Sequence, residues 1–149
     1  MEPAFRIATY KDIETLLMFM RAFYAIDDCP FGEAAARGAV REFIGDPALG
    51  RLWLIELGTE PVGYLVLTLG YSLEYHGRDA FIDEFFIAPS YRHQGIGSRA
   101  MQMLEAACRE LGVHALHLEV ERQNLAAQGL YCRFGFENHD RYLMSKRLE

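Results

Sequence analysis

Residues 81–121 constrain the fold of this 149-residue chain most strongly. An apolar run at residues 81–87 is followed by a glycine-containing turn, an amphipathic pattern at residues 96–111 and a second apolar run at residues 115–121. A helix between two strands of one sheet forms a βαβ crossover, which joins parallel neighbours. Upstream, residues 52–57 and 62–73 have the pattern of two strands separated by a short turn, which predicts an antiparallel hairpin. The sequence therefore predicts a mixed sheet.

The remaining segments complete the expected fold. A short strand is predicted at residues 5–9, helices at 10–24 and 33–44, a short helix at 124–133 and a last strand at 141–146. The order βααβββαβαβ predicts an α/β (α+β) fold, with a mainly antiparallel sheet and helices on both faces. Because the sequence contains neither a repeat nor a linker, residues 1–149 are expected to form a single domain.

Charge and cysteine content narrow the function classes. The chain has 15 basic and 21 acidic side chains, a net charge of −6, which is the opposite of what nucleic-acid binding favours. No apolar run reaches the ~20 residues of a membrane span, and the first ten residues lack the pattern of a secretory signal. Three scattered cysteines fit a reducing compartment. We therefore expect a cytoplasmic protein with neither nucleic-acid nor membrane partners.

His114 and His117 have a spacing that suggests a pair of metal ligands. Residues three apart on a strand point to opposite faces of a sheet, however. We therefore predict packing or surface roles for both histidines and no metal site.

The turn at residues 92–98 is the sharpest local motif. Gly95 and Gly97 remove the Cβ atoms that would block a close approach to the backbone. The first amides of the following helix have no partner within the helix and lie at its positive end, so they favour an anion, most naturally a phosphate. Arg92 adds a full positive charge. The alternative is a simple turn from strand to helix.

Asp83 and Glu84 lie inside an apolar strand, where burying a carboxylate is costly. Successive strand side chains face opposite ways, so these two share a face only if a bulge intervenes. We expect one of them to face a cleft, where burial raises its pKa and suits it to accept a proton. The alternative is that both are salt-bridge partners at a sheet edge.

Asn124 and Tyr131 are seven residues apart, which places them on one face of the predicted short helix. Asn124 can cap that helix. Tyr131 can donate a proton to a departing thiolate, and its alternative role is a core tyrosine whose hydroxyl is satisfied.

Together these features resemble the GCN5-related N-acetyltransferase (GNAT) superfamily over residues 81–146. The resemblance rests on Phe85-Phe86-Ile87-Ala88-Pro89, Tyr91-Arg92-His93-Gln94-Gly95-Ile96-Gly97, Leu118-Glu119-Val120, Asn124-Leu125-Ala126-Ala127, Leu130-Tyr131 and Phe134-Gly135-Phe136. It implies that the chain binds acetyl-CoA as a co-substrate. The cofactor-binding residues that it implies are Phe85, Phe86, Ile87, Arg92, His93, Gln94, Gly95, Ile96, Gly97, Ser98 and Asn124. His93 stands where the family commonly has glycine, and it still supplies a backbone amide.

The implied reaction is N-acetyl transfer from acetyl-CoA to a primary amine by direct attack. An alkyl amine has a pKa of about 10.4 and arrives protonated, so a base must take its proton. Asp83 is the first candidate for that base and Glu84 the second, while Tyr131 would protonate the coenzyme A thiolate. Within the family, the adjacent acids are most similar to the polyamine and diamine acetyltransferases, which implies a small cationic amine as acceptor.

The acceptor is expected to bind to the first half of the chain. Residues 1–77 carry 6 basic and 11 acidic groups, a net charge of −5, and residues 78–149 form the expected acetyl-CoA-binding part. Asp27 and Asp28, with Asp83, are the candidate acceptor-binding residues, although Asp27 and Asp28 are also good turn residues. Three alternatives stay open: another acceptor (a protein amine, an aminoglycoside or an amino acid), a non-catalytic acyl-CoA-binding module, and a homodimer in place of a monomer.

Overall fold

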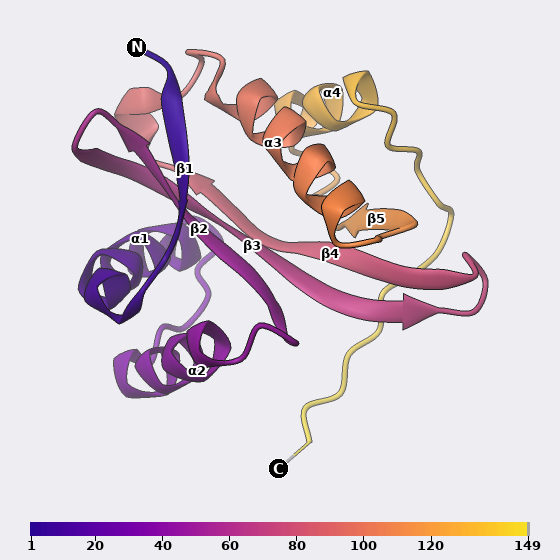
Figure 1. The fold of residues 1–149 in the computed structure, drawn as a ribbon, viewed down its shortest axis with the longest axis horizontal. Coiled ribbons are helices and arrows are strands. Elements are labelled where there is room, and N and C mark those ends of the chain that lie inside the picture. Colours follow the sequence, from indigo (N-terminus) through magenta and orange to yellow (C-terminus); the bar gives the residue numbers. More distant parts are fainter. Residues whose placement is uncertain (149) are drawn as a thin grey trace. The chain divides into compact units, whose positions relative to one another are not determined.

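A computed structural model describes residues 1–148 and divides the chain into two compact units, Met1–Glu119 and Val120–Glu149. The first unit contains a five-stranded sheet in the order β1-β2-β3-β4-β5, in which every pair is antiparallel except β4 and β5 (Figure 1). The strands are β1 (Pro3–Ile7), β2 (Gly50–Leu57), β3 (Glu60–Ser72), β4 (Gly77–Ile87) and β5 (Ala115–Leu118). The predicted α/β fold with a mainly antiparallel sheet is confirmed.

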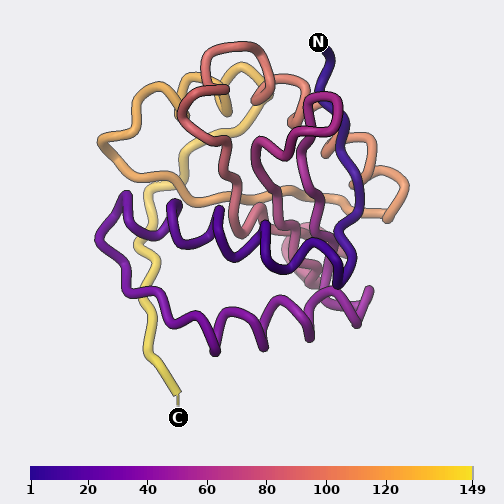
Figure 2. The backbone as a smooth tube through the Cα atoms, turned by 90° about the vertical axis from the view of Figure 1, so that its left-hand side faces the viewer, coloured from indigo at the N-terminus to yellow at the C-terminus, as the bar shows by residue number. Residues whose placement is uncertain are grey.

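Three helices cover the two faces of this sheet. They are α1 (Ile13–Ile26), α2 (Glu33–Gly45) and α3 (Ile96–Glu110), with short 3-10 turns η1 (Tyr10–Asp12) and η2 (Pro89–Tyr91). Figure 1 shows α1 and α2 on one side of the strands and α3 on the other, and Figure 2 shows α1 and α2 running side by side. This arrangement agrees with the helices that the sequence predicts on both faces.

The larger core lies between α1 and the sheet. Leu16, Leu17 and Phe19 of α1 are at most 5% exposed, and they pack in one cluster with Tyr64 of β3 and Phe86 of β4. The residues of α1 follow the helical spacing of an apolar stripe. Each such side chain contributes about 1.5–3 kcal/mol when it is fully buried. The orientation of α1 over β3 and β4 therefore depends on this cluster.

Asp12 fixes the start of α1 against β1. Its two carboxylate oxygens accept hydrogen bonds from the Arg6 guanidinium, each at 3.0 Å, and one oxygen also accepts the backbone N–H of Thr9 at 2.8 Å. The bonds from Arg6, more than the other contacts, hold the pKa of Asp12 below its ordinary value. The Asp12 carboxylate therefore stabilises the junction between β1 and α1 as long as this carboxylate stays ionised.

The second unit contains one helix, α4 (Leu125–Arg133), and the predicted cap is confirmed: Asn124 Oδ1 accepts the Ala127 N–H at 3.1 Å. The strand predicted at residues 141–146 is wrong, because these residues have no regular secondary structure. A strand is defined by ladder hydrogen bonds to a neighbour, and this segment pairs with none among the described residues. Strand β5 likewise ends at Leu118 instead of residue 121.

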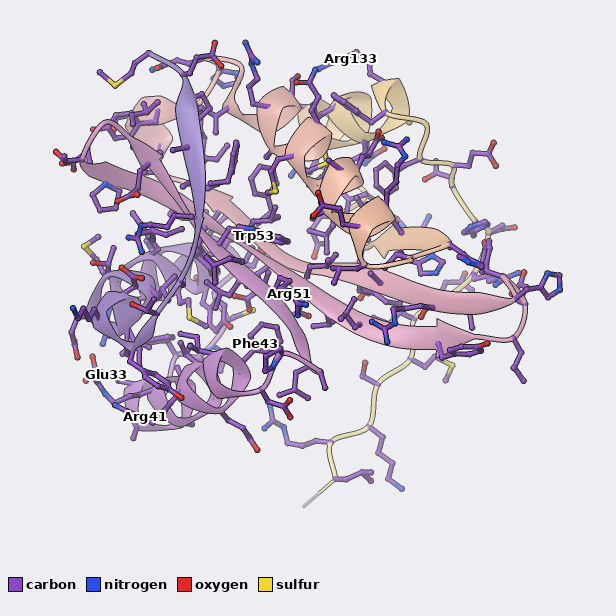
Figure 3. All side chains as sticks on the ribbon, viewed as in Figure 1. Glu33, Arg41, Phe43, Arg51, Trp53 and Arg133 are labelled. Carbon is purple, nitrogen blue, oxygen red and sulfur yellow. The ribbon has the colours of Figure 1, made fainter. Side chains whose placement is uncertain are left out.

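Gly50, the first residue of β2, tests how closely β3 and α2 approach this end of the strand. Figure 3 shows Phe43 pointing from α2 toward β2, and a Cβ atom on Gly50 would lie 2.8 Å from Phe43 Cζ and 1.9 Å from the Leu67 carbonyl oxygen. We therefore expect Gly50→Ala to lower the free energy of unfolding by about 2–3 kcal/mol, measured by urea denaturation.

Gly38 is the matched control for this substitution. It lies in the exposed interior of α2, and a Cβ atom added there would have nothing within 4 Å. Because alanine favours a helix more than glycine does, Gly38→Ala should raise the free energy of unfolding by about 0.5–1 kcal/mol. Equal stability of the two variants would contradict the close packing at Gly50.

Candidate active site

A bulge in β4 sets the geometry of Asp83 and Glu84, the acid pair. Leu67 of β3 is opposite Ile82, but the next residue of β3, Val66, is opposite Glu84, so Asp83 is the extra residue. Cross-strand partners share a face, and Val66 belongs to the core under α1. Glu84 therefore faces α1. Asp83 points away from the Ile82 face and so toward the same side as Glu84. The condition under which the two acids share a face is met.

Glu84 is a half-buried carboxylate that two tyrosine hydroxyls contact. Tyr24 of α1 donates to Oε2 at 2.5 Å, and Tyr64 of β3 donates to Oε1 at 2.8 Å. Burial raises the pKa of Glu84, the two tyrosine hydrogen bonds oppose that rise, and the charge of Asp83 adds to it. Burial, followed by the neighbouring Glu84, raises the pKa of both phenols, so they remain protonated donors.

Asp83 has different surroundings. Its side chain is accessible to water, and it forms no hydrogen bond with any residue in the range 1–148. Nearby protein atoms still desolvate its carboxylate and raise the pKa of Asp83. A carboxylate that is accessible, unpaired and more basic than usual has the properties required of a proton acceptor.

The turn before α3 has the backbone geometry of an anion site. Gly95, the N-cap residue, has a φ of +83°, a left-handed conformation that favours glycine. His93 has a φ of +62°, which accounts physically for the glycine that the family commonly has at this position. The 15-residue helix that follows directs its first amides and its positive dipole end toward this turn.

Arg92 is tied to the end of β4. Its Nε donates to the Ile87 carbonyl at 2.7 Å, and its guanidinium lies 5.6 Å from the centre of the Phe86 ring. Gln94 donates from Nε2 to the Ser90 carbonyl at 3.3 Å. The Arg92 side chain therefore attaches the turn to the strand that holds the acid pair, and the Gln94 side chain attaches it to η2.

The edge of β4 beyond the bulge is paired on one side only among the strands of this sheet. The ladder with β5 ends at Ile82 and Leu118, whereas the ladder with β3 continues to Ile87. Of the predicted cofactor-binding residues here, Phe86 is 3% exposed and packs in the core, so only its backbone is available to a ligand. An edge with unpaired backbone groups can accept an extended ligand arm.

Asp27 and Asp28 lie where the turn-forming alternative places them. Asp27 is the C-cap of α1, and Asp28 has a φ of +53° in the turn that follows. Both are exposed, and the Cys29 N–H donates to the Tyr24 carbonyl at 2.9 Å to close the turn. Acceptor binding by these two residues stays a prediction.

Tyr131 and Asn124 belong to the second unit. The Tyr131 ring packs edge-on against Phe136 with ring centres 5.7 Å apart, and burial raises the pKa of its phenol. Asn124 uses its side chain as the helix cap. Their predicted roles toward thiolate and cofactor remain predictions.

Residues 1–148 contain no cluster of three or more potential metal ligands, and no described helix is long and apolar enough to cross a membrane. His117 contacts Asp79 instead, with Nε2 3.2 Å from Oδ2. This contact agrees with the packing role predicted for the histidine.

Sequence reasoning misses Tyr24 and Tyr64 as site residues. The sequence pattern places Tyr24 only in the apolar stripe of a helix and Tyr64 only within a strand. They precede Glu84 by 60 and 20 residues, so no local spacing links them to it. The available signal is a hydroxyl on each of two residues otherwise placed on a buried face, because buried phenols need a partner.

Comparison with known proteins identifies relatives of the chain. "Uncharacterized N-acetyltransferase YycN" of Bacillus subtilis (strain 168) is 34% identical over 98 residues, 65% of this chain and 61% of that protein. The thialysine N-epsilon-acetyltransferase of Bos taurus is 31% identical over 77 residues, 52% of this chain and 45% of that protein. The chain thus spans about three fifths or less of the length of these curated relatives.

A solved structure has the same fold as this chain. The integron cassette protein HFX_CASS3, from the mobile metagenome of Cole Harbour Salt Marsh, has a TM-score of 0.86 and 41% identity over 97% of this chain and 90% of that one.

The model of the Acetyltransferase (GNAT) family matches residues 20–136, a stretch that includes the acid pair, the glycine turn and α4. The resemblance stated from the sequence is confirmed, and the chain belongs to the Acetyltransferase (GNAT) family.

Proposed function

We propose that the protein is an acetyl-CoA-dependent N-acetyltransferase. The observation that carries the proposal is the bulge in β4, which turns Asp83 and Glu84 to one face of a strand whose end is attached to the anion-binding turn of α3. Family membership supports acetyl transfer as the reaction. The glycine turn supports a donor with phosphate groups, and the one-sided edge of β4 suits an extended arm such as pantetheine.

In the proposed mechanism, Asp83 takes a proton from the incoming ammonium, directly or through water. The neutral amine then attacks the thioester carbonyl. A backbone amide near Phe86 or Ile87 stabilises the developing oxyanion. When the C–S bond breaks, Tyr131 gives its proton to the coenzyme A thiolate. The acetylated nitrogen still carries one extra proton, which passes through water to the Tyr131 phenolate. The acetyl group ends on the amine, and no covalent enzyme intermediate forms.

The proposed acceptor is a small cationic amine. Asp83 and Glu84 share one face, and the first 77 residues carry a net charge of −5. The relative from Bos taurus, a thialysine N-epsilon-acetyltransferase, supports an alkyl amine as acceptor. A cation entering this region would gain from several carboxylates at once.

The cofactor assignment is tested by Gly97→Val. Gly97 lies in the first turn of α3, where a branched side chain would keep a phosphate away from the helix amides. We expect the affinity for coenzyme A, measured by calorimetry, to fall at least about tenfold, while the circular dichroism spectrum stays unchanged. Unchanged affinity in a folded variant would place the cofactor elsewhere.

Tyr131→Phe tests the proposed acid. The substitution keeps the ring that packs on Phe136 and removes only the proton donor. We expect kcat to fall about 10²-fold or more with little change in acetyl-CoA affinity, because the hydroxyl acts as the thiolate leaves. Wild-type kcat in this variant would mean that water protonates the thiolate.

The acceptor proposal is tested with a panel of diamines, amino acids, aminoglycosides and peptides, by following free thiol release. Diamines should give the highest kcat/KM, and their KM should rise with ionic strength because salt screens the carboxylates. Asp83→Asn should lower kcat more than Glu84→Gln does. In the wild type, kcat should fall as the pH drops through the raised pKa of Asp83, since the protonated acid cannot accept a proton. A neutral acceptor that outcompetes diamines, or a KM independent of salt, would contradict the proposal.

A further inference from the structure

The acid pair of β4 presents an electrostatic problem. Two carboxylates on one face repel each other, and such pairs tend to share one proton. Glu84 differs from its neighbour, because each of its oxygens accepts a hydrogen bond from a phenol, Tyr24 at 2.5 Å and Tyr64 at 2.8 Å. Asp83 has no such partner within residues 1–148. The two neighbours are therefore suited to different tasks.

We infer that Tyr24 and Tyr64 are positioning residues that hold Glu84 as a fixed anion for the ammonium group of the acceptor and leave Asp83 to exchange the proton. This inference rests on the proposed function and assigns its acceptor site. A donor to each oxygen fixes the plane of the carboxylate and stabilises its charged form more than its neutral form.

Packing keeps both phenols in place. Tyr64 is 0% exposed, and its ring centre lies 6.1 Å from that of Phe86 and 6.4 Å from that of Phe19. The Tyr24 ring packs edge-on against Phe31 with centres 5.7 Å apart. Neither hydroxyl can leave the carboxylate without disturbing an aromatic cluster. The two donors come from different layers of the fold, one from α1 and one from β3.

The titratable groups that act on Glu84 are few and come from each surrounding element. They are Tyr24 from α1, Tyr64 from β3 and Asp83 from β4. A fourth group, Cys29 in the turn after α1, acts on Tyr24. The phenols lower the pKa of Glu84, whereas burial and the charge of Asp83 raise it. Loss of either phenol must therefore move the pKa of Glu84 upward.

The direct test is a carbon-13 NMR titration of the Glu84 carboxyl group without substrate. Tyr24→Phe and Tyr64→Phe keep the rings and remove one donor each. We expect the pKa of Glu84 to rise by about one in each variant. Tyr71→Phe, a 72% exposed tyrosine of β3, is the control and should leave the titration unchanged. An unchanged Glu84 titration in the Tyr24→Phe variant overturns the inference, whether or not Tyr64→Phe folds.

Kinetics with 1,4-diaminobutane and acetyl-CoA test the catalytic consequence. In both phenylalanine variants the KM for the amine should rise about three- to tenfold at pH values where Glu84 becomes protonated, and return toward the wild-type value at higher pH. The kcat at saturating amine should stay within about twofold of wild type. The amine itself stays protonated throughout this range, so it does not contribute to the change.

A double variant separates positioning from a general structural effect. In a Glu84→Gln background, adding Tyr24→Phe should change the KM no further, because the anion that the phenol holds is gone. A further loss in that background, or a loss confined to kcat, overturns the inference. A wild-type protein that acetylates no amine would refute the proposed function, while the NMR titration, which needs no turnover, still decides whether the phenols hold the Glu84 charge.

Discussion

The bulge in β4 is the constraint on which the rest of the first unit depends. Before it, Ile82 pairs with Leu67; after it, Phe86 pairs with Tyr64 and packs in the core under α1. One extra residue in a strand reverses the face of every side chain that follows. If Asp83 instead paired with Val66 in a regular ladder, Phe86 would turn away from that core and Glu84 would lose its tyrosine partners. The bulge also coincides with the end of the β5 ladder.

Stability and the candidate site use the same residues. Tyr64 is a fully buried core side chain and a hydrogen-bond donor to Glu84, and Tyr24 reaches the same carboxylate from the helix whose start is fixed by the Arg6–Asp12 ion pair. A half-buried carboxylate is costly unless its oxygens have donors. The aromatic cluster supplies those donors without opening the core to water.

The turn before α3 holds backbone geometry that a free chain rarely adopts. Gly95 tolerates a positive φ readily, whereas His93 does so at a steric cost of about 1–2 kcal/mol. Two side-chain hydrogen bonds, from Arg92 to the Ile87 carbonyl and from Gln94 to the Ser90 carbonyl, hold the turn in this conformation. This local strain lies at the turn for which we propose an anion-binding role.

The sequence alone determined the order of elements through α4, the glycine turn, the Asn124 cap and the family, because helical stripes, strand alternation and caps are encoded within a few residues. It left open which way Asp83 and Glu84 face, and it did not reveal Tyr24 and Tyr64 as partners of Glu84. The strand expected at residues 141–146 is wrong for a related reason. Register, bulges and ladder pairing are settled by contacts between residues far apart in the chain, such as Tyr24 and Glu84, 60 positions apart. Only tertiary packing brings such groups together, and no local pattern records it.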